Sequence, residues 1–308
     1  MGKWTVEGPE KITFEEPLDV LQVRVVAGAV NVVAADGPAR LEVAELEGDP
    51  LLVSLEDGVL TVTYKDLSWS EVTESAKSVE KVKTFFEGLR RKRRAVVSLT
   101  VPAAAEVKIG SVSADTTVSG VAGKVGVQGA SGETTLVNLS GRADVKSVTG
   151  DVNAQSVAGE LRVNTVSGHL TVVAGSGEKL HAKSVSGSVT LDLDATTPTD
   201  LHVATVSGPV AVRLPSAADA KVEAGSTGGE LSSTFEELTI GGGWGTRKLS
   251  GQLGSGTGRL QVNTVSGAVT VLRRPESEDG QVRFTKELPA APAEAPTAGT
   301  DTDPAQEG

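Results

Sequence analysis

Glycine recurs every nine residues through the middle of the chain, and this spacing limits the fold more than any other feature of the sequence. Between positions 114 and 177 the spacing is strict, with alanine at 114, and longer connections separate the later members. The repeat glycines are Gly123, Gly132, Gly141, Gly150, Gly159, Gly168, Gly177, Gly187, Gly208 and Gly267. Because glycine accepts backbone angles that a β-carbon opposes, we expect each of them to form a tight corner.

An alternating apolar pattern precedes each glycine. Apolar residues stand seven and five positions before it, as Leu161 and Val163 do before Gly168. A small residue, mostly Ser or Thr, stands three positions before, and Val almost always stands two before. The position six before is polar without a preferred chemical group, and its occupants are Asp144, Asn153, Arg162, Thr171, His181, His202 and Gln261. Alternation over five residues predicts a strand with one buried and one solvated face.

Strands of this length cannot bury an apolar face alone, so the repeats must stack on one another. Two units of about nine residues close one coil of about 18–20 residues. The sequence therefore predicts an all-β fold, a parallel β-solenoid of the β-roll or β-helix type, with a three-sided cross-section left open. The decapeptide VNTVSGHLTV (163–172) returns as VNTVSGAVTV (262–271), and we interpret both copies as structural repeats. Aromatic residues make up 3% of the chain, which suits a narrow core.

The regions outside the repeats define the organisation of the chain. Residues 1–66 read as a β segment that leads into the solenoid, and residues 95–274 as the solenoid itself. Between them, apolar residues at helical spacing and a capping pair, Ser68 and Glu71, predict an amphipathic helix with a basic end over 67–94, either an insertion or a cap. Residues 215–259 read as a wider final turn, and 275–308 as a disordered, acidic, Pro/Ala-rich tail.

Composition excludes several functional classes. The chain has no Cys, which removes disulfides and thiolate chemistry. It shows no apolar leader and no apolar run long enough to span a membrane, so we expect a cytoplasmic location. Its net charge is −11, which argues against nucleic acid as a partner.

Candidate chemical groups are few and scattered. His181 and His202 share a position in the repeat and are expected to stack, but no third ligand shares their register. The residues after the repeat glycines lack the paired acids of a calcium roll, and the Gly-rich stretches 241–245 and 254–258 lack the strand-then-helix setting of a phosphate loop. Asp144, Asp151, Lys146 and Lys183 fall at different positions of the coil. We therefore predict no catalytic residue, no metal ligand and no cofactor, and a protein that is not an enzyme.

The basic run at the end of the predicted helix is the sharpest feature outside the repeats. It consists of Arg90, Arg91, Lys92, Arg93 and Arg94. Five consecutive cations after an amphipathic helix are a candidate contact for an anionic membrane surface. The alternative is that the helix covers an open end of the solenoid, with the cations solvating its C-terminus and interacting with the helix dipole.

The corner units carry a resemblance to a known family. The units SVSG (184–187) and TVSG (205–208 and 264–267), with the block LSGQLGSGTGRLQVNTVSGAVTVLRR (249–274), resemble the bacterial β-strand-repeat family labelled "putative adhesin", a domain of unknown function. The resemblance covers roughly residues 20–272. It implies a β-solenoid and transfers no catalytic residue.

Strict backbone periodicity without a recurrent chemical group favours a non-enzymatic scaffold or adhesin-like interaction protein, with a repetitive flat face for contact with protein partners. The first alternative is a cytoplasmic scaffold that associates with a membrane surface through the helix and Arg90–Arg94. The second is a carbohydrate-active β-helix enzyme. The identity of any partner and the formation of a homo-oligomer stay open at this point.

Overall fold

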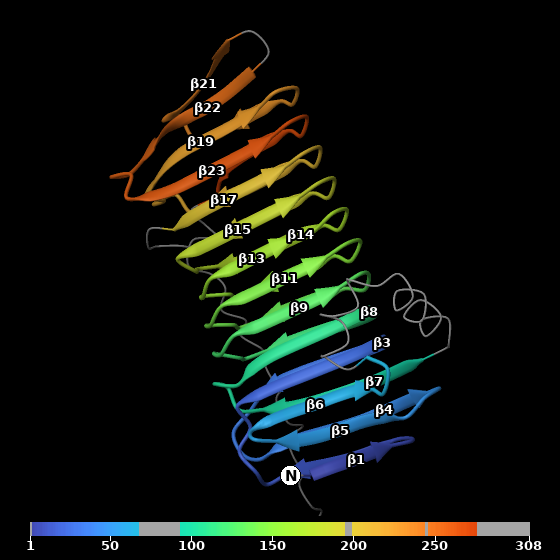
Figure 1. Cartoon of the computed structure of the whole chain (residues 1–308). Coiled ribbons are helices and arrows are strands. Elements are labelled where there is room, and N and C mark those ends of the chain that lie inside the picture. The colour runs from blue at the N-terminus through green and yellow to red at the C-terminus, as the bar shows by residue number, and fades with distance from the viewer. Residues whose placement is uncertain (1, 68–92, 195–198, 244–245, 276–308) are drawn as a thin grey trace, which may run out of the picture.

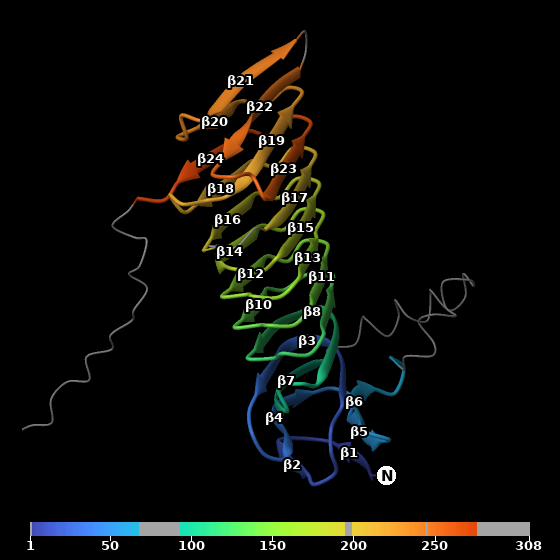
Figure 2. The same ribbon diagram turned by 90° about the vertical axis from the view of Figure 1, so that its left-hand side faces the viewer.

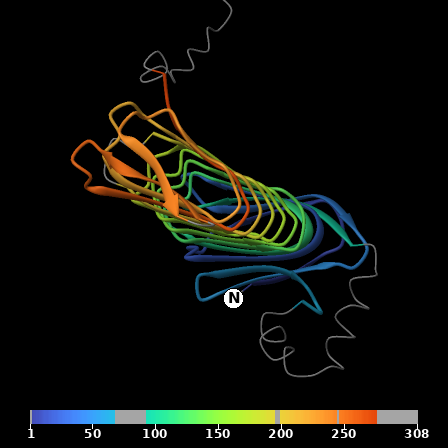
Figure 3. The same cartoon turned by 90° about the horizontal axis from the view of Figure 1, so that it is seen from above.

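The computed structural model describes residues 2–67, 93–194, 199–243 and 246–275, and these residues form 24 β-strands and no helix. The strands stack into an elongated body in which two sheets face each other across a thin core (Figures 1 and 2). Seen along its length, the chain traces a pile of flattened coils (Figure 3). Within the described ranges, nothing has the helical length and apolarity that a membrane crossing requires.

The first sheet, which faces the viewer in Figure 1, runs from β1 near the N-terminus to β21 at the far end. Its strands, in spatial order, are β1 (Gly2–Val6), β5 (Leu51–Glu56), β6 (Val59–Tyr64), the first half of β3 (Val20–Ala34), the first half of β8 (Glu106–Ser119), β9 (Val125–Gly129), β11 (Ala143–Ser147), β13 (Leu161–Asn164), β15 (Lys179–Ser184), β17 (Asp200–Thr205), β23 (Gly258–Thr264), β19 (Ala220–Ser226), β22 (Thr246–Leu253) and β21 (Leu238–Gly243).

The second sheet lies behind the first and shares its two longest strands. Its strands, in spatial order, are β2 (Glu10–Phe14), β4 (Ala39–Glu47), β7 (Arg94–Val101), the second halves of β3 and β8, β10 (Thr134–Val137), β12 (Val152–Gln155), β14 (Leu170–Gly175), β16 (Val189–Leu193), β18 (Val210–Leu214), β24 (Val269–Arg273) and β20 (Leu231–Ser233). Because β3 and β8 pass through the bend between the sheets, they tie the two sheets together.

The register confirms parallel coils with two strands each. Ala143 on β11 pairs with Leu161 on β13, which is eighteen residues along the chain, and the same step separates Val152 on β12 from Leu170 on β14. Later coils are longer, since Leu161 pairs with Leu180 and Leu180 with Leu201. The predicted apolar positions of these strands are all buried, as in Leu161 and Val163. The three-sided cross-section is therefore not the one observed.

The repeat glycines lie at two kinds of corner, and most of them are needed for a reason other than the predicted one. Of the ten, only Gly132 has a positive φ, at 97°. Eight of the ten stack directly over another glycine, so that a β-carbon at Gly159 would overlap the carbonyl oxygen of Gly141 in the coil below, and one at Gly168 that of Gly150. Close stacking of the backbone, rather than a special backbone angle, excludes larger residues.

The two corners turn the chain differently. The first corner leads from the first sheet to the second, and there a buried hydroxyl bridges the turn, as when Thr205 Oγ1 donates to the carbonyl of Gly208 at 2.8 Å. The second corner leads back, and there the residue three before the glycine is left-handed, with φ of 53° at Asn138, 54° at Ser156 and 52° at Ala174. The coil is therefore an eighteen-residue unit with two unlike halves.

The final coil is inserted between two others. β23 and β24 follow β22 in sequence, yet they lie between the coil of β17 and β18 and the coil of β19 and β20. Val262 on β23 pairs in parallel with Val203 on one side and with Ala224 on the other. Residues 215–259, expected to be a wide final turn, instead supply the terminal coil and the antiparallel hairpin β21–β22 that covers its first-sheet edge.

Arg274 fastens this inserted coil. It follows β24 and is buried, and its guanidinium donates to Asp194 at 2.9 Å, to Asp192 at 2.6 Å and to the carbonyl of Leu193 at 3.0 Å. These partners lie at the end of β16, two coils toward the N-terminus. Burial lowers the pKa of Arg274, but the two carboxylates outweigh it, so the net pKa is raised and the cation stays charged.

The N-terminal end is closed by antiparallel strands. β1 pairs with β5 and β5 with β6 in the first sheet, while β2 pairs with β4 and β4 with β7 in the second. The helix predicted over 67–94 is not supported, because Leu67, Arg93 and Arg94 are not helical and residues 68–92 lie outside the described residues. The predicted tail also lies outside them, apart from position 275.

Candidate interaction surface

A line of exposed valines runs along the first corner. It consists of Val148, Val166, Val185, Val206 and Val265, each 46–53% exposed, and we name it the valine ridge. Backbone hydrogen bonds join each coil to the next directly beside these residues, as when Ser167 N donates to the carbonyl of Val148 at 2.8 Å. The same ladder continues toward the N-terminus through Ala130 and Val112, so six steps of about 4.8 Å give an apolar line about 29 Å long.

The conformation of the corner explains why these valines face outward. In each unit the Ser or Thr that precedes the valine points inward, where its hydroxyl bonds to the corner glycine, as Ser184 does to Gly187. The valine that follows must then point away from the core. At the second corner the equivalent residues, Leu139 and Val157, are buried instead. The nine-residue frame of the sequence merges the two corners, and only an eighteen-residue frame separates outward from inward valines.

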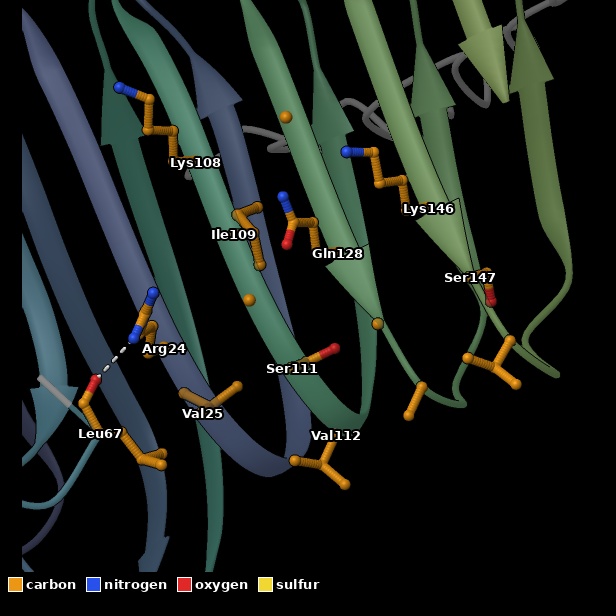
Figure 4. Close-up of a pocket in the computed structure, with 15 residues that line it drawn as sticks. Arg24, Val25, Leu67, Lys108, Ile109, Ser111, Val112, Gln128, Lys146 and Ser147 are labelled. Carbon is orange, nitrogen blue, oxygen red and sulfur yellow. Dashed lines mark hydrogen bonds between the residues drawn. The ribbon is translucent and has the colours of Figure 1, made fainter. Parts of the chain in front are cut away.

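A hollow opens on the outer face of the first sheet at the N-terminal end of this line (Figure 4). It has a volume of about 560 Å³ and spans β3, β8, β9 and β11. Val25, Leu67, Val112, Ala130 and Val148 are among the residues that line it. The hollow and the valine ridge therefore form one continuous apolar surface.

Two glycines make the floor of the hollow. Gly110 lies between Arg24 and Gln128 in one outward row of the sheet, and Gly126 lies between Lys108 and Asp144 in the next row. Neither has a positive φ. A β-carbon at Gly110 would meet nothing closer than 3.6 Å and one at Gly126 nothing closer than 4.0 Å. Both positions could therefore hold a side chain, and the missing side chains create the hollow.

Three cations border the hollow, and none of its fifteen lining residues is acidic. Arg24 Nη1 donates to the carbonyl of Leu67 at 3.0 Å, and burial lowers its pKa. Lys108 pairs with Glu106, which lies outside the hollow, at 3.1 Å. Lys146 is exposed and forms no ion pair with a described residue.

The five cations of the predicted anionic-surface contact do not share one environment. Arg90, Arg91 and Lys92 lie outside the described residues, and Arg94 is exposed beside Glu45 at 3.5 Å. Arg93, by contrast, has a side chain only 4% exposed, and it pairs with Asp49 at 2.5 Å and with Asp66 at 2.7 Å. Arg93 is therefore an internal ion-pair residue and cannot reach a membrane surface from this position.

Arg93 also shapes its surroundings. Its guanidinium lies 5.2 Å from the centre of the Tyr64 ring, a cation–π arrangement in a buried setting. Burial of the Tyr64 hydroxyl raises its pKa to about 12, although the nearby Arg93 cation lowers it in part. The two ends of the segment 68–92 are thereby held together, because Asp66 precedes the segment and Arg93 follows it.

The remaining candidate groups do not converge. His181 and His202 stack as predicted, with ring centres 6.0 Å apart, and no group of three potential metal ligands occurs among the described residues. Asp144 lies opposite Arg162 in register, while Asp151 accepts a hydrogen bond from the backbone of His169 at 2.8 Å. Lys183 lies two coils away from Lys146 in the same outward row.

The Gly-rich stretch 254–258 has a structural role. Its residues fold around Asp219, whose carboxylate accepts hydrogen bonds from Ser255 Oγ and Thr257 Oγ1, both at 2.6 Å, and from the backbone N–H of Thr257 at 3.0 Å. These hydrogen bonds, led by the one from Ser255, lower the pKa of Asp219 to about 2. In the other stretch, residues 241–243 belong to β21, and residues 244–245 lie outside the described part of the chain.

Comparison with known proteins gives a matching family model and two similar solved structures. The family model for Toastrack DUF4097 matches residues 57–272. No curated protein matches the chain. A solved structure from Clostridium sporogenes ATCC 15579, described as "a putative cell adhesion protein", is 12% identical, with 86% of this chain and all of that one covered and a TM-score of 0.27. Another, from Bacteroides fragilis NCTC 9343 and described as "a putative adhesin", is 11% identical, with 87% and 98% covered and a TM-score of 0.40.

Proposed function

This chain belongs to the Toastrack DUF4097 family, and we propose that it is a non-enzymatic β-solenoid scaffold that binds protein partners along the valine ridge. The observation that carries the proposal is the alignment of five half-exposed valines on successive coils. Single exposed apolar residues are ordinary on protein surfaces, whereas a continuous apolar line rimmed by polar residues is typical of an interaction site.

The surroundings of the valine ridge support its role. The outward rows of the first sheet beside it are polar and vary in chemistry, as in the sequence Lys146, Asn164, Lys183 along one row. A partner would therefore meet apolar side chains along the ridge and hydrogen-bonding groups at its flank, which is the usual arrangement of a protein interface. We accordingly place the contact on the corner rather than on the flat face.

The scattered positions of the candidate acids and bases support binding rather than catalysis. General acid–base chemistry needs two groups within hydrogen-bond reach of one substrate. Asp144 and Asp151 lie on opposite sides of a corner, since Asp144 belongs to β11 and Asp151 immediately precedes β12. A carbohydrate-active site has no further support.

A triple variant tests the proposal. Val166→Thr, Val185→Thr and Val206→Thr together keep the β-branched shape and remove three apolar surfaces from the centre of the ridge. A matched control replaces exposed valines elsewhere, Val33→Thr and Val173→Thr, which are 47% and 43% exposed.

The readout is the set of proteins that each immobilised variant retains from a lysate of the source cells. We expect wild type and control to retain the same proteins and the ridge variant to lose them, with all three unfolding at similar temperatures. Equal retention by the ridge variant and wild type would show that the contact lies elsewhere.

A further inference from the structure

We propose that the partner of the valine ridge is a second copy of this chain, in a dimer whose two-fold axis runs parallel to the stack of coils. Since the surface is the one assigned above to protein contact, this dimer rests on the proposed function and names the partner. Three features support it: the spacing of the ridge, the hydrogen bonding of the row beside it, and the charges on its two flanks.

The spacing of the valines selects the kind of partner. Successive ridge residues belong to successive coils, so apolar groups and the gaps between them recur about every 4.8 Å. Side chains on one face of an extended peptide recur about every 6.8 Å, and the turns of an α-helix about every 5.4 Å, so both lose step with the ridge within a few coils. A second stack of the same coils keeps step along the whole length, and its valines can fill the gaps between those of the first.

The row of hydroxyl side chains next to the ridge can be covered without loss of hydrogen bonds. Each ridge valine is followed by Ser or Thr, whose hydroxyl donates to a backbone carbonyl of the neighbouring coil, as Ser186 Oγ does to Val166 at 3.3 Å. The same bond, at 3.2–3.4 Å, is made by Thr149, Ser167, Ser207 and Ser266. A buried polar group costs free energy chiefly when it has no partner. This edge of the flattened coils (Figure 3) is therefore suited to burial against another protein.

The two flanks of the ridge carry opposite charges. On the first-sheet side, Lys146 and Lys183 are exposed, and neither forms an ion pair with a described residue. On the second-sheet side, exposed acids follow one another on three successive coils and pair with no cation among the described residues; they are Asp115, Glu133 and Asp151. Each flank therefore lacks counter-charges within one chain.

These charges favour one orientation of the two copies. A two-fold axis parallel to the stack places the first-sheet flank of one copy opposite the second-sheet flank of the other, with equal coils at the same level. Lys146 and Asp151 lie on opposite sides of Val148 in one coil, so Lys146 then faces Asp151 of the second copy, and the pair occurs twice. Copies that run in opposite directions would place two first-sheet flanks together, and the row of Lys146 contains no acid from β9 to β23.

Sedimentation equilibrium of the purified full-length chain tests the dimer. We expect the weight-average mass to rise from that of one chain toward that of two as the concentration increases from micromolar to millimolar. The triple threonine variant of the ridge should associate at least tenfold more weakly. The control with Val33→Thr and Val173→Thr should stay within twofold of wild type.

Reversal of single charges tests the orientation. Lys146→Glu and Asp151→Lys should each weaken association at least tenfold, because like charges then face each other across the two-fold axis. In an equimolar mixture of these two variants both contacts again join opposite charges, so mixed dimers should form within threefold of the wild-type affinity. Lys124→Glu changes the net charge as Lys146→Glu does, but it lies at the second corner, just before β9, and should have no effect. Circular dichroism checks that every variant is folded.

Several results would overturn the dimer. A folded wild type that stays monomeric, or equal association of wild type and ridge variant, removes it. Single charge variants that associate normally, or a mixture that does not recover, exclude the proposed orientation. If the purified chain stays monomeric while the ridge variant still loses proteins from the lysate, the ridge binds a different protein, so the proposed function stands and the dimer fails. If the ridge variant loses neither, both fail.

Discussion

At the corners of the coil, eight of the ten repeat glycines lie over the glycine carbonyl of the coil below, and on the first sheet two other glycines lie in strands with open space above them. The same residue type therefore meets opposite constraints. At Gly159 any side chain would collide with backbone that cannot move without disturbing two coils, whereas at Gly126 a methyl group would meet only solvent and ordinary contacts. Substitution at these positions should change stability in opposite directions.

We predict that Gly159→Ala lowers the free energy of unfolding by about 3 kcal/mol, because the added β-carbon overpacks a close backbone contact. Gly126→Ala should raise it by about 0.5 kcal/mol, because alanine loses less conformational entropy on folding. Urea unfolding followed by circular dichroism measures both. A loss of stability in both variants would mean that the space above Gly126 is not open.

Asp219 makes the stability of the folded state depend on pH in a predictable way. Its folded-state pKa of about 2 lies below the ordinary value of 3.8, so its carboxylate stabilises the folded state above pH 4, and this contribution is lost as the pH falls through about 2. We expect Asp219→Asn to have a lower urea midpoint than wild type at pH 7, and the difference to close between pH 4 and pH 2.

The control for this experiment is Asp36→Asn. The side chain of Asp36 forms no hydrogen bond or ion pair with the described residues. Its midpoint should follow that of wild type at every pH. If the gap between Asp219→Asn and wild type stayed constant down to pH 2, the turn at 254–258 would not depend on the charge of Asp219.

At the scale of the elements, the inserted pair β23 and β24 is the part of the fold that depends most on distant contacts. Both strands have parallel neighbours on either side, and Arg274 then ties the end of β24 to Asp192 and Asp194. A buried ion pair stabilises the fold little more than a pair of well-packed apolar residues in its place would. Removal of only one partner, however, leaves an uncompensated buried charge.

We predict that Arg274→Met lowers the free energy of unfolding by about 3 kcal/mol, since Asp192 remains largely buried with half of its charge compensation gone. The control is Arg162→Met, which removes an exposed pair with Glu160 and should cost about 0.5 kcal/mol. Thermal unfolding measures both, and similar melting temperatures for the two variants would show that Arg274 does not fasten the coil.

The sequence predicts the elements whose signal is local, and it does not predict the contacts that join residues distant in sequence. The buried positions of β11, β13 and β15 and the stacking of His181 on His202 follow from a local period, and the structure confirms them. The insertion of β23 beside β17 could not be predicted, because Val262 matches the repeat equally well at any level of the stack. The burial of Arg93 was hidden for a similar reason, since its partner Asp49 is distant in sequence.

For the candidate interaction surface too, the sequence shows only part of what the structure shows. The sequence shows that valine recurs two residues before most repeat glycines, but it does not show that Val166 faces outward while Val157 faces inward. That difference depends on which strand of the coil precedes the corner. Gly110 and Gly126 lie outside the nine-residue frame, so no periodic signal marks them, and only the missing side chains in two outward rows reveal the hollow.

At the scale of the whole molecule, the stack is nearly one-dimensional, because each coil contacts mainly the coils directly above and below it. Ala143 and Leu161 occupy equivalent places eighteen residues apart, so a coil in this region is a removable unit. Removal of half that length puts a second-sheet strand in the place of a first-sheet strand, and two corners of the same kind then follow each other.

We predict that excision of residues 143–160 leaves a folded protein shortened by about 4.8 Å, because Leu161 then follows Arg142 in the place of Ala143. Excision of residues 143–151 should prevent folding, since it connects a first-sheet position to β12 of the second sheet. Circular dichroism and small-angle scattering distinguish the outcomes. Two equally folded products would contradict a coil with unlike halves.

The inserted coil has a consequence for the order in which the protein is completed. The strands β19 and β20 leave the ribosome before β23 and β24, yet in the finished fold they rest on them. Until residue 273 has been synthesised, the terminal coil has no neighbour to dock on, and a gap one coil wide separates it from β17 and β18. β19 and β20 therefore reach their final pairing only after β23 and β24 have been synthesised and have inserted between them and β17–β18.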